Sequence, residues 1–274
     1  MTTKRMVIHG AAGRMGLSVA RVIAEDAGAT LVGALEQAGS AAIGADIGEL
    51  AGIGLLGVPV RSDAGAVLGA SGGERPDVVI DFSLPAALPP LLAACRAASV
   101  PLVSGTTGLD EATEAARREL GGRVPAVFAP NFSQGVNAFF FLAKRAAELL
   151  GPGFDAEIVE VHHRHKVDAP SGTAERLFRV VAEGKGLQTH VPTYGRSGQV
   201  GERPDGEIGV FAMRGGDVVG EHTLYLFGDG ERIELSHRAT DRQIFARGAV
   251  RAAHWICGRA PGLYDMGDVM GIPR

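Results

Sequence analysis

The stretch VIHGAAGRMG, residues 7–16, decides the fold class of this 274-residue chain. It places Gly10, Gly13 and Gly16 directly after a β-branched apolar run and at the predicted start of a helix. Glycines let a backbone approach a pyrophosphate, and the first amides of a helix are unpaired donors that favour an anion. A plain tight turn also explains the glycines. Their position after a strand is what predicts a dinucleotide-binding βα unit.

An acidic residue stands where this interpretation requires one. Glu36 follows Gly16 by twenty residues and closes the strand-like run TLVGALE. A carboxylate at that position accepts hydrogen bonds from the adenine ribose, and Arg14 can add a phosphate contact. The carboxylate repels a ribose 2′-phosphate, and the next residue is Gln37 rather than a cation. We therefore expect NADH to be used at least as well as NADPH.

Short apolar runs alternate with helical segments throughout the first half of the chain. The runs are MVIHG, TLVGALE, PDVVIDFS, PLVSGT and PAVFAP. Strands that are apolar on both faces predict a parallel sheet covered by helices. Small polar loops follow three of these runs: DFS at 81–83, GTTG at 105–108 and APNFS at 129–133. An open α/β sheet holds its ligand at such strand ends, although each loop taken singly is better explained as a turn.

The pattern changes after Phe132. A helical run, SQGVNAFFFLAKRAAELL, is followed by the strand AEIVEVHH, the helix AERLFRVVAEG and an irregular stretch from His190 to Gly206. The runs EIGVFAMR, EHTLYLF and RIELSHRAT are expected to form antiparallel strands, and the helix QIFARGAVRAAHWIC to pack back on the first domain. We therefore expect one domain from 1–132 with 243–274 and a second from 133–242.

The second sheet is expected to have two apolar faces. Alternation puts Ile208, Val210 and Ala212 on one face and Phe211 and Met213 on the other. Helices of the same domain can cover one of these faces. The other is expected to meet another subunit.

The stretch VHHRHKVDAPSGTA, residues 161–174, gathers cations in an acidic chain. If the strand continues, His162, Arg164 and Lys166 lie on one face and His163 and His165 on the other. Neither face then offers two histidines and a carboxylate at ligand spacing, so no metal is expected. A solvated charged edge is the plainer alternative.

The helix that opens at Ser171, Gly172 and Thr173 follows the cations and adds a second set of unpaired amides. Together they suit a compact substrate that carries carboxylates. His162 is the natural proton donor, because histidine changes charge near neutral pH. Lys166 can serve as a cationic anchor and as a second proton source.

Composition narrows the class of protein. Apolar residues make up 46% and charged residues 21%, as in ordinary globular proteins. The 27 Lys and Arg stand against 31 Asp and Glu, and the net charge of −4 argues against a nucleic-acid partner. No apolar run is long enough for a membrane span, and the N-terminus has no signal-peptide pattern. We expect a cytoplasmic enzyme whose two cysteines, Cys95 and Cys257, are reduced.

Several stretches resemble the 4-hydroxy-tetrahydrodipicolinate (dihydrodipicolinate) reductase family. They are GAAGRMG, ALEQAGS, DFS, SGTTG, APNFSQGVN, VEVHHRHKVDAPSGTA, GDVVGEHT and FARGAVRAAHWI, in order along nearly the whole chain. The resemblance implies a Rossmann-like nucleotide domain, a mixed α+β substrate and oligomerisation domain, a homotetramer and a hinge that closes over the substrate. It also implies reduction of a cyclic dicarboxylate by NADH or NADPH with loss of water, in diaminopimelate and lysine biosynthesis.

The resemblance also implies roles for individual residues. The proton donor would be His162 and the second catalytic residue Lys166. The cofactor would be held by Gly10, Ala11, Ala12, Gly13, Arg14, Met15, Glu36, Gly105, Thr106, Thr107, Ala129, Pro130, Asn131 and Phe132. The substrate carboxylates would contact His163, Gly172 and Thr173. Many members of the family carry Arg where this chain has Gln37, which again favours NADH.

Two other functions fit part of the sequence. A related NAD-dependent amino-acid dehydrogenase would keep the glycine loop but has no need of HHRHK, residues 162–166. A non-catalytic dinucleotide sensor would bind NADH without a proton donor beside a carboxylate site. The presence of both His162 and Lys166 counts against the sensor.

Overall fold

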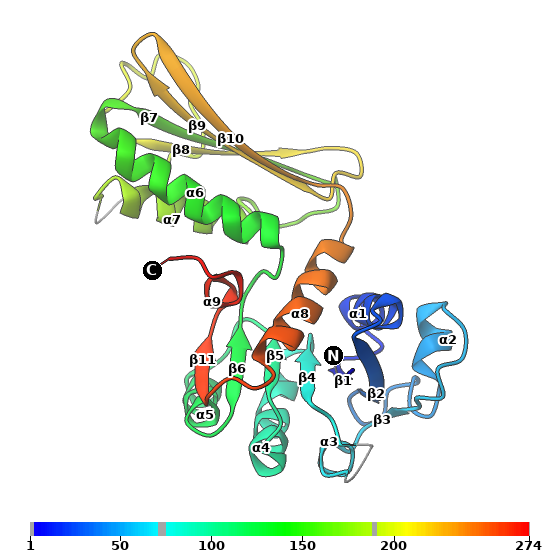
Figure 1. The fold of residues 1–274 in the computed structure, drawn as a ribbon. Helices are drawn as coiled ribbons and strands as arrows, with labels where there is room; N and C mark the ends of the chain where they lie inside the picture. The colour runs from blue at the N-terminus through cyan, green and yellow to red at the C-terminus, as the bar shows by residue number, and fades with distance from the viewer. Residues whose placement is uncertain (1–2, 71–74, 188–190, 274) are drawn as a thin grey trace. The chain divides into compact units, whose positions relative to one another are not determined.

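The chain divides into two units, each with its own sheet and its own core. Unit 1 is Met1–Gln134 with Gln243–Arg274, and unit 2 is Gly135–Arg242. The computed structural model describes residues 3–70, 75–187 and 191–273 (Figure 1). None of the helices in these ranges is long and apolar enough to cross a bilayer.

Seven parallel strands form the sheet of unit 1, in the order β11-β6-β5-β4-β1-β2-β3 (Figure 1). The five strands expected from the sequence are confirmed, and so is their parallel arrangement. Two edge strands were not expected, because they are only two and three residues long. The strands are β1 Lys4–His9, β2 Ala29–Leu35, β3 Val60–Arg61, β4 Val78–Asp81, β5 Leu102–Ser104, β6 Pro125–Phe128 and β11 Gly262–Tyr264.

Helices cover both faces of this sheet, as the apolar strands require. Along β1, Met6 and Ile8 belong to one buried cluster, whereas Val7 belongs to another. The first cluster includes residues of α1 Arg14–Glu25, α8 Gln243–Ile256 and the short helices α2 Ile47–Ala51 and α9 Met266–Met270. The second includes residues of α3 Ala64–Leu68, α4 Leu88–Ala98 and α5 Glu111–Gly121. Side chains that alternate along a strand therefore fill two separate layers.

The helix α8 packs on unit 1, as expected, although unit 2 precedes it in the sequence. Its residues Ala246, Ala249 and Ala253 are buried in the first cluster. Contact is closest at Gly248, where a Cβ would lie 1.8 Å from the carbonyl oxygen of Phe132. His254 near the end of α8 also lies 2.7 Å from Asp26, beside the end of α1. Through these contacts α8, which follows unit 2 in the sequence, is part of the core of unit 1.

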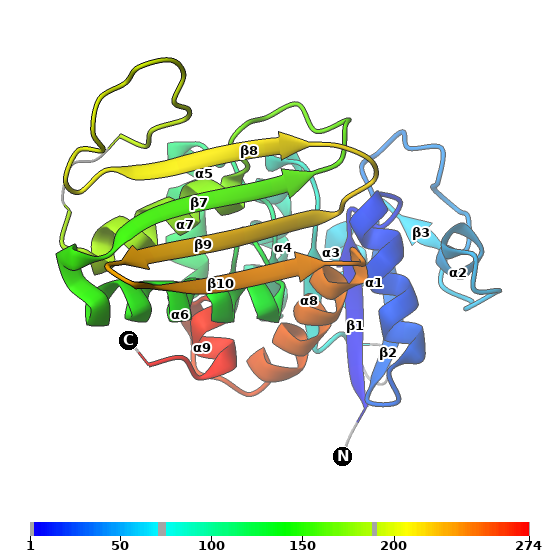
Figure 2. The ribbon, with the colours of Figure 1, turned by 90° about the horizontal axis from the view of Figure 1, so that it is seen from above.

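Unit 2 contains a mixed four-stranded sheet in the order β10-β9-β7-β8 (Figure 2). The strands are β7 Asp155–His162, β8 Ile208–Arg214, β9 Gly220–Gly228 and β10 Glu231–Ala239. The expectation that all three last strands are antiparallel is wrong, because β8 pairs with β7 in parallel. The chain between them passes through α7 Gly172–Gly184, and such a helical crossover returns the next strand in the same direction. β9 is antiparallel to both β7 and β10.

One face of this sheet carries the core of unit 2. Ile158, Val210 and Leu224 pack with Phe139 of α6 Gln134–Leu150 and Leu177 of α7. The opposite face is also rich in apolar side chains, as expected: Val159, Phe211, Met213, Tyr225 and Phe227, of which Met213 is 55% exposed. Tyr225 and Phe227 stack with ring centroids 5.7 Å apart.

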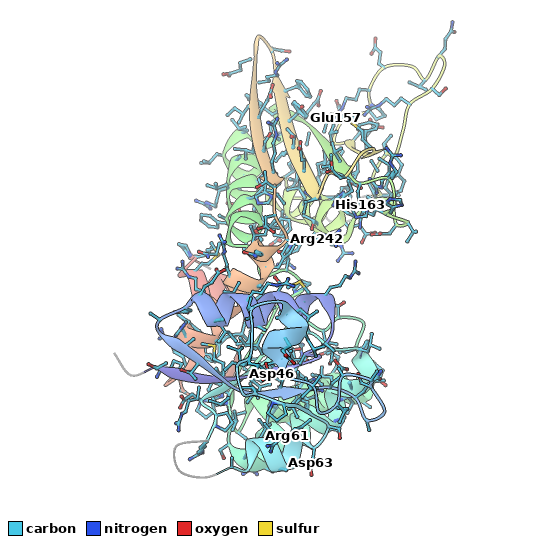
Figure 3. The ribbon with its side chains drawn as sticks, turned by 90° about the vertical axis from the view of Figure 1, so that its right-hand side faces the viewer. Asp46, Arg61, Asp63, Glu157, His163 and Arg242 are labelled. Carbon is cyan, nitrogen blue, oxygen red and sulfur yellow. The ribbon has the colours of Figure 1, made fainter. Side chains whose placement is uncertain are left out.

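The stretch before β8 is irregular, as expected, over residues 191–206; His190 lies outside the described residues. Two arginines anchor it to the sheet. Arg196 pairs at 2.8 Å with Glu157 of β7, which is labelled in Figure 3, and it also pairs with Glu207. Arg203 lies 3.2 Å from Glu157 and 2.6 Å from Asp155. This irregular stretch is therefore attached along the start of β7.

Candidate active site

The glycine loop of unit 1 has the geometry of an anion cradle. Gly10 has φ +72°, and a Cβ there would lie 2.7 Å from the carbonyl oxygen of Phe82. A Cβ at Gly16 would lie 2.3 Å from the carbonyl oxygen of Gly10, so α1 starts closely packed on the loop. The N-cap of α1 is Gly13, which has no side chain to accept from the first amides, and the first turn has no acid. These amides are thus left for an anionic ligand, and Arg14 is exposed beside them.

Glu36 lies directly after β2 and is tied to the glycine loop. Its Oε2 accepts from the amide of Ala12 at 3.0 Å, and its Oε1 accepts from the amide of Gln37 at 3.0 Å. Each carboxylate oxygen keeps a further lone pair, so the side chain can still accept from ribose hydroxyls. Gln37 is exposed beside it.

Asp81 is a buried carboxylate that holds the ends of neighbouring strands together, and the sequence analysis did not identify it. Asp81 at the end of β4 is fully buried and lies 2.8 Å from Nδ1 of His9, its partner in the β1–β4 register. It also accepts from the hydroxyls of Ser104 at 2.6 Å and Thr106 at 2.8 Å. Burial alone would raise the pKa of Asp81, but its contact with His9, and then those with Ser104 and Ser83, outweigh burial and lower the pKa. The ends of β1, β4 and β5 are therefore fixed to one anion.

The loops after β5 and β6 form a pocket at the same edge of the sheet. Its lining includes four residues predicted to border the nicotinamide end: Thr106, Thr107, Ala129 and Pro130. Gly105 lies against Phe82, where a Cβ would be 2.3 Å from a ring carbon.

Two other residues predicted for the cofactor are turned toward the protein. The ring of Phe132 packs edge-on against Phe82 at 5.6 Å, and the residue as a whole is only 1% exposed, so it supports the turn after β6 from inside the protein and does not face a ligand. The side-chain oxygen of Asn131 accepts from the amide of Ser133 at 2.9 Å, which shapes the turn after β6. The hydroxyl of Thr106 is likewise used by Asp81.

The cationic stretch of unit 2 is a turn and does not continue the strand. β7 ends at His162, and the amide of Lys166 donates to the carbonyl of His163 at 3.1 Å. The predicted two faces beyond His162 are therefore wrong. The partner strand β8 ends at Arg214, which is paired with His162, so no ladder remains to extend β7. Instead the amide of Gly215 donates to the carbonyl of His162 at 2.9 Å, and the turn begins there.

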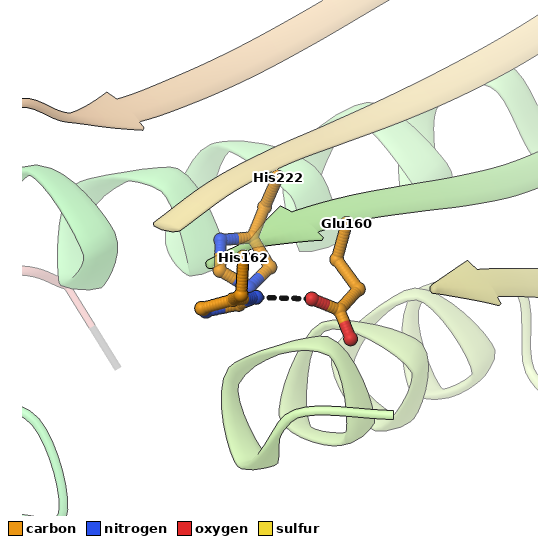
Figure 4. A group of neighbouring side chains, drawn as sticks. All are labelled: Glu160, His162 and His222. Carbon is orange, nitrogen blue, oxygen red and sulfur yellow. Dashed lines mark hydrogen bonds and ion pairs between the residues drawn. The ribbon is translucent and has the colours of Figure 1, made fainter. Parts of the chain in front are cut away.

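His162 contacts a buried acid that lies two residues earlier on the same strand. Glu160 is fully buried, and its Oε2 is hydrogen-bonded to Nδ1 of His162 (Figure 4). The other oxygen, Oε1, accepts from Arg214 at 2.9 Å and from the amide of Ser171 at 3.1 Å. Burial alone would raise the pKa of Glu160, but the bonds from His162 and Arg214 outweigh it and lower the pKa to about 2. Glu160 is therefore ionised at neutral pH.

Lys166 and His163 stand beside this pair with partners of their own. Nζ of Lys166 lies 2.8 Å from both oxygens of Asp168, and the lysine side chain is 19% exposed. Nε2 of His163 lies 3.1 Å from the guanidinium of Arg242 (Figure 3). Burial and the charge of Arg242 lower the pKa of His163. Arg242, which sequence reasoning did not place here, thus adds a cation next to a residue predicted to contact carboxylates.

The helix α7 begins at Gly172, as expected, and its N-cap is Ser171. The Ser171 hydroxyl accepts from the amide of Ala174 at 3.2 Å. Gly172 is exposed, and a Cβ there would meet nothing within 4 Å. The amides of Gly172 and Thr173, the first two of α7, are available to a carboxylate.

Glu160, His162 and His222 are close enough together to hold a metal ion, since their ligand atoms lie within 4.8 Å of one another. The sequence argument against two histidines and a carboxylate overlooked His222 on β9. The surroundings nevertheless oppose a cation. The Arg214 guanidinium already lies 2.9 Å from the Glu160 carboxylate, and the other Glu160 oxygen meets His162. Both Glu160 oxygens therefore already have partners within the protein.

Family models match both parts of the chain. One, described as "Dihydrodipicolinate reductase, N-terminus", covers residues 4–132, and another, "Dihydrodipicolinate reductase, C-terminus", covers residues 135–270. The C-terminal match includes α8, which the structure places in unit 1.

Relatives with this activity in their names match over the full length. The 4-hydroxy-tetrahydrodipicolinate reductase of Alkalilimnicola ehrlichii is 53% identical over 98% of this chain and 100% of the relative. That of Geobacter sulfurreducens is 49% identical over 98% of this chain and 99% of the relative.

Solved structures confirm the Rossmann-like fold class predicted for unit 1 and the mixed sheet of unit 2. A dipicolinate-bound dihydrodipicolinate reductase from Paenisporosarcina sp. TG-14 aligns with a TM-score of 0.77 at 24% identity, over 96% of this chain and 98% of that one. An amine dehydrogenase from Mycobacterium smegmatis shares the fold less closely, with a TM-score of 0.57 at 15% identity, over 99% and 96% of the two chains. From its full-length matches, the chain belongs to the dihydrodipicolinate reductase family.

Proposed function

We propose that this chain reduces 4-hydroxy-tetrahydrodipicolinate to tetrahydrodipicolinate, with oxidation of a nicotinamide dinucleotide and loss of water, for diaminopimelate and lysine biosynthesis. The relatives in Alkalilimnicola ehrlichii and Geobacter sulfurreducens carry this activity in their names. The other two functions weighed from the sequence, a related amino-acid dehydrogenase and a non-catalytic sensor, leave the cluster at residues 160–173 without a use.

Unit 1 supplies the residues for the cofactor. The dinucleotide would lie on the glycine loop, Gly10 to Met15, with Glu36 on its adenine ribose and the pocket at residues 106–107 and 129–130 toward its nicotinamide end. The close packing at Gly10 and Gly16 fits this group, because it holds the first amides of α1 toward a pyrophosphate. When bound, a reduced nicotinamide supplies the hydride.

Unit 2 supplies the proton and binds the dicarboxylate. The hydroxyl of the substrate leaves as water, so the reaction consumes one proton along with the hydride. His162 is placed to donate it, because its ring is held by an ionised carboxylate on one nitrogen. Lys166 serves as a cation for the substrate carboxylates and as a second proton source. His163 and the amides of Gly172 and Thr173 would bind the carboxylates themselves.

One observation carries this proposal. The Glu160 carboxylate bonds both the ring of His162 and the amide of Ser171, so the proton donor and the start of α7 lie around the same anion. A proton donor beside an open helix N-terminus suits the reduction of a substrate that carries carboxylates. The direct test is a spectrophotometric assay of NADH and NADPH oxidation with freshly generated 4-hydroxy-tetrahydrodipicolinate. The proposal requires oxidation that depends on this substrate and fails if neither cofactor is consumed.

The cofactor preference is testable at Gln37. We propose that NADH is used at least as well as NADPH, because Glu36 is a carboxylate and exposed Gln37 brings no positive charge to the ribose. Gln37→Arg is expected to raise the ratio of kcat/KM for NADPH to that for NADH by about tenfold, the gain of one charged hydrogen bond. The control Gln199→Arg adds the same charge to an exposed position of unit 2. An unchanged ratio in Gln37→Arg would show that this side chain does not face the ribose.

Pyridine-2,6-dicarboxylate is expected to bind the cofactor complex and to compete with the substrate. Both of its carboxylates have candidate partners, the cations around residue 166 and the first amides of α7. Calorimetric titration should show binding that is at least about tenfold tighter than that of pyridine-2-carboxylate, which lacks one carboxylate. No heat with the dicarboxylate, or equal affinity for both compounds, would contradict the assigned site.

We further propose a homotetramer that covers the outer face of the unit 2 sheet. The support is the apolar side chains on that face, among them Met213 at 55% exposure and Phe227 at 38%. A cytoplasmic location is proposed with it, supported by the free state of Cys95 and Cys257.

A further inference from the structure

Glu160 is the buried acid beside the proposed proton donor His162, and the role inferred for it rests on the proposed function. Alternation along β7 puts Glu160 and His162 on the same side of the sheet, where both are buried. Burying a carboxylate is costly unless it is well satisfied. Three donors satisfy this one: His162 of β7, Arg214 of β8 and the amide of Ser171, the N-cap of α7.

The charge of Glu160 decides which nitrogen of His162 is free. An ionised carboxylate only accepts hydrogen bonds, so the Nδ1 that faces it must carry a proton. The neutral ring then has its lone pair on Nε2, and the proton that the ring gives away leaves from Nε2. The space next to this nitrogen is kept open by Gly220 of β9, where a Cβ would lie 2.9 Å from Nε2.

His222 joins the same network from the neighbouring strand. It is directly paired with Glu160 across β7 and β9 and is 4% exposed. Its Nε2 lies 3.1 Å from the hydroxyl of Ser171, and its ring meets that of His162 edge-on at 5.2 Å (Figure 4). Burial, and then the charge of His162, lower the pKa of His222 to about 4, so it is neutral when the enzyme works. A neutral ring can pack against His162 without repelling it.

Ser171 connects this network to the carboxylate-binding end of α7. Its amide donates to Glu160, and its hydroxyl accepts from Ala174 and contacts His222. The next two amides, of Gly172 and Thr173, are those proposed to bind the substrate. A shift of Glu160 would therefore move the proton donor and the carboxylate site together.

We propose that Glu160 is a positioning residue that fixes Nε2 of His162 as the proton-donating nitrogen, and that it keeps this nitrogen in register with the first amides of α7 through Ser171 and His222. The competing use of the cluster is a divalent cation between Glu160, His162 and His222. A cation would replace the proton on the His162 nitrogen that faces Glu160, so the two uses predict different spectra.

The tautomer of His162 in the unaltered enzyme is the first test. Long-range ¹H–¹⁵N spectra of the full chain with ¹⁵N-labelled histidine, with NADH bound, should show His162 protonated at Nδ1 and unprotonated at Nε2 at alkaline pH. The signals are assigned by their loss in His162→Gln. A proton on Nε2 would overturn the proposal, and so would one equivalent of zinc or another divalent metal that copurifies with the chain. This test does not depend on turnover.

Glu160→Gln is the second test, because the amide keeps the shape of the side chain and removes its charge. We expect kcat to fall on the order of 10²-fold while the Kd for NADH is unchanged. The pH profile of kcat should also change, since the proposed proton donor loses its anionic partner. Other charged or titratable groups near this ring are Arg214, His222, His163, Lys166 and, beyond His222, His237 of β10; all are unchanged in the variant.

Glu231→Gln is the matched control, since it removes an exposed carboxylate of β10 in the same unit. A Glu160→Gln enzyme with the kcat and pH profile of the wild type would overturn the proposal. If this variant does not fold, the wild-type spectrum still decides. A wild-type enzyme that lacks the proposed reductase activity but shows the Nδ1 proton would instead contradict the function, so the two failures are distinguishable.

Discussion

Replacing Lys166 with alanine is expected to lower kcat by on the order of 10²–10⁴-fold while leaving the Kd for NADH nearly unchanged. The lysine belongs to unit 2, and its ammonium lies 2.8 Å from both oxygens of Asp168 in the turn after β7. In the reaction proposed above, its loss removes a cation and a proton source from the proposed dicarboxylate site. The residues proposed to bind the nucleotide are in unit 1 and are not altered.

Loss of folding would not explain that result. Asp168 is 56% exposed, so the ion pair with Lys166 is solvated and contributes about 0–1 kcal/mol to stability. Lys144→Ala is the matched control, because it removes an ion pair with Glu183 on the surface of the same unit. Lys166→Arg separates the two roles: the charge is kept, but a guanidinium cannot release a proton near neutral pH. If Lys166→Arg has the wild-type KM but a low kcat, the lysine acts in proton transfer. A large loss of NADH binding in Lys166→Ala would contradict the assignment of Lys166 to the dicarboxylate site.

The second large effect is expected at the glycine loop. In Gly16→Ala, the new Cβ would lie 2.3 Å from the carbonyl oxygen of Gly10 and 2.6 Å from that of Ala11. Both neighbours are backbone atoms of the loop itself, so the loop must move. We expect a loss of about 3 kcal/mol in the free energy of unfolding and at least about a tenfold weaker Kd for NADH.

Gly65→Ala is the control for this variant. Gly65 lies in the short helix α3, and a Cβ there would lie 3.3 Å from the carboxylate of Asp63, a side chain that can move. The stability and NADH affinity of Gly65→Ala should match or slightly exceed those of the wild type. Calorimetric unfolding and NADH titration of both variants measure these effects. Wild-type affinity in Gly16→Ala would show that the dinucleotide does not depend on this loop.

The sequence predicts unit 1 well because its signals are local. Each parallel strand is a short apolar run, and the ligand loops follow directly in the sequence, so DFS, GTTG and the residues after β6 meet at one edge of the sheet. The sequence does not predict β3 and β11, which have two and three residues. Such edge strands are defined by their neighbours and carry too few residues for a periodic pattern.

Unit 2 shows where local patterns are insufficient. The apolar run of β8 is consistent with either direction, and the helical crossover through α7 makes it parallel to β7. Similarly, the prediction that side chains alternate between two faces after His162 assumes that the strand still has a partner. It has none in β8, because β8 ends at Arg214, opposite His162. Strand direction and strand ends were thus set by pairing, which is a long-range property.

The candidate site was predicted in part. His162, Lys166, His163 and the start of α7 are named by one continuous stretch. Glu160 was within reach of the same reasoning, because it is two residues before His162 on the buried face of a strand. His222 was not, since its contact with Ser171 joins residues 51 apart. The same holds for Asp81, whose bond to His9 spans 72 residues and whose role is to fix three strand ends.

The most direct test of the account is the fate of a deuterium on the transferring face of NADH. The chain should oxidise the labelled cofactor only when 4-hydroxy-tetrahydrodipicolinate is present, and mass spectrometry should find the deuterium on carbon in the tetrahydrodipicolinate that forms. The Lys166→Ala enzyme should bind the same cofactor and transfer the label far more slowly. Cofactor oxidation without deuterium in the dicarboxylate product, or no oxidation of either NADH or NADPH, would contradict the assignment of this chain as the reductase.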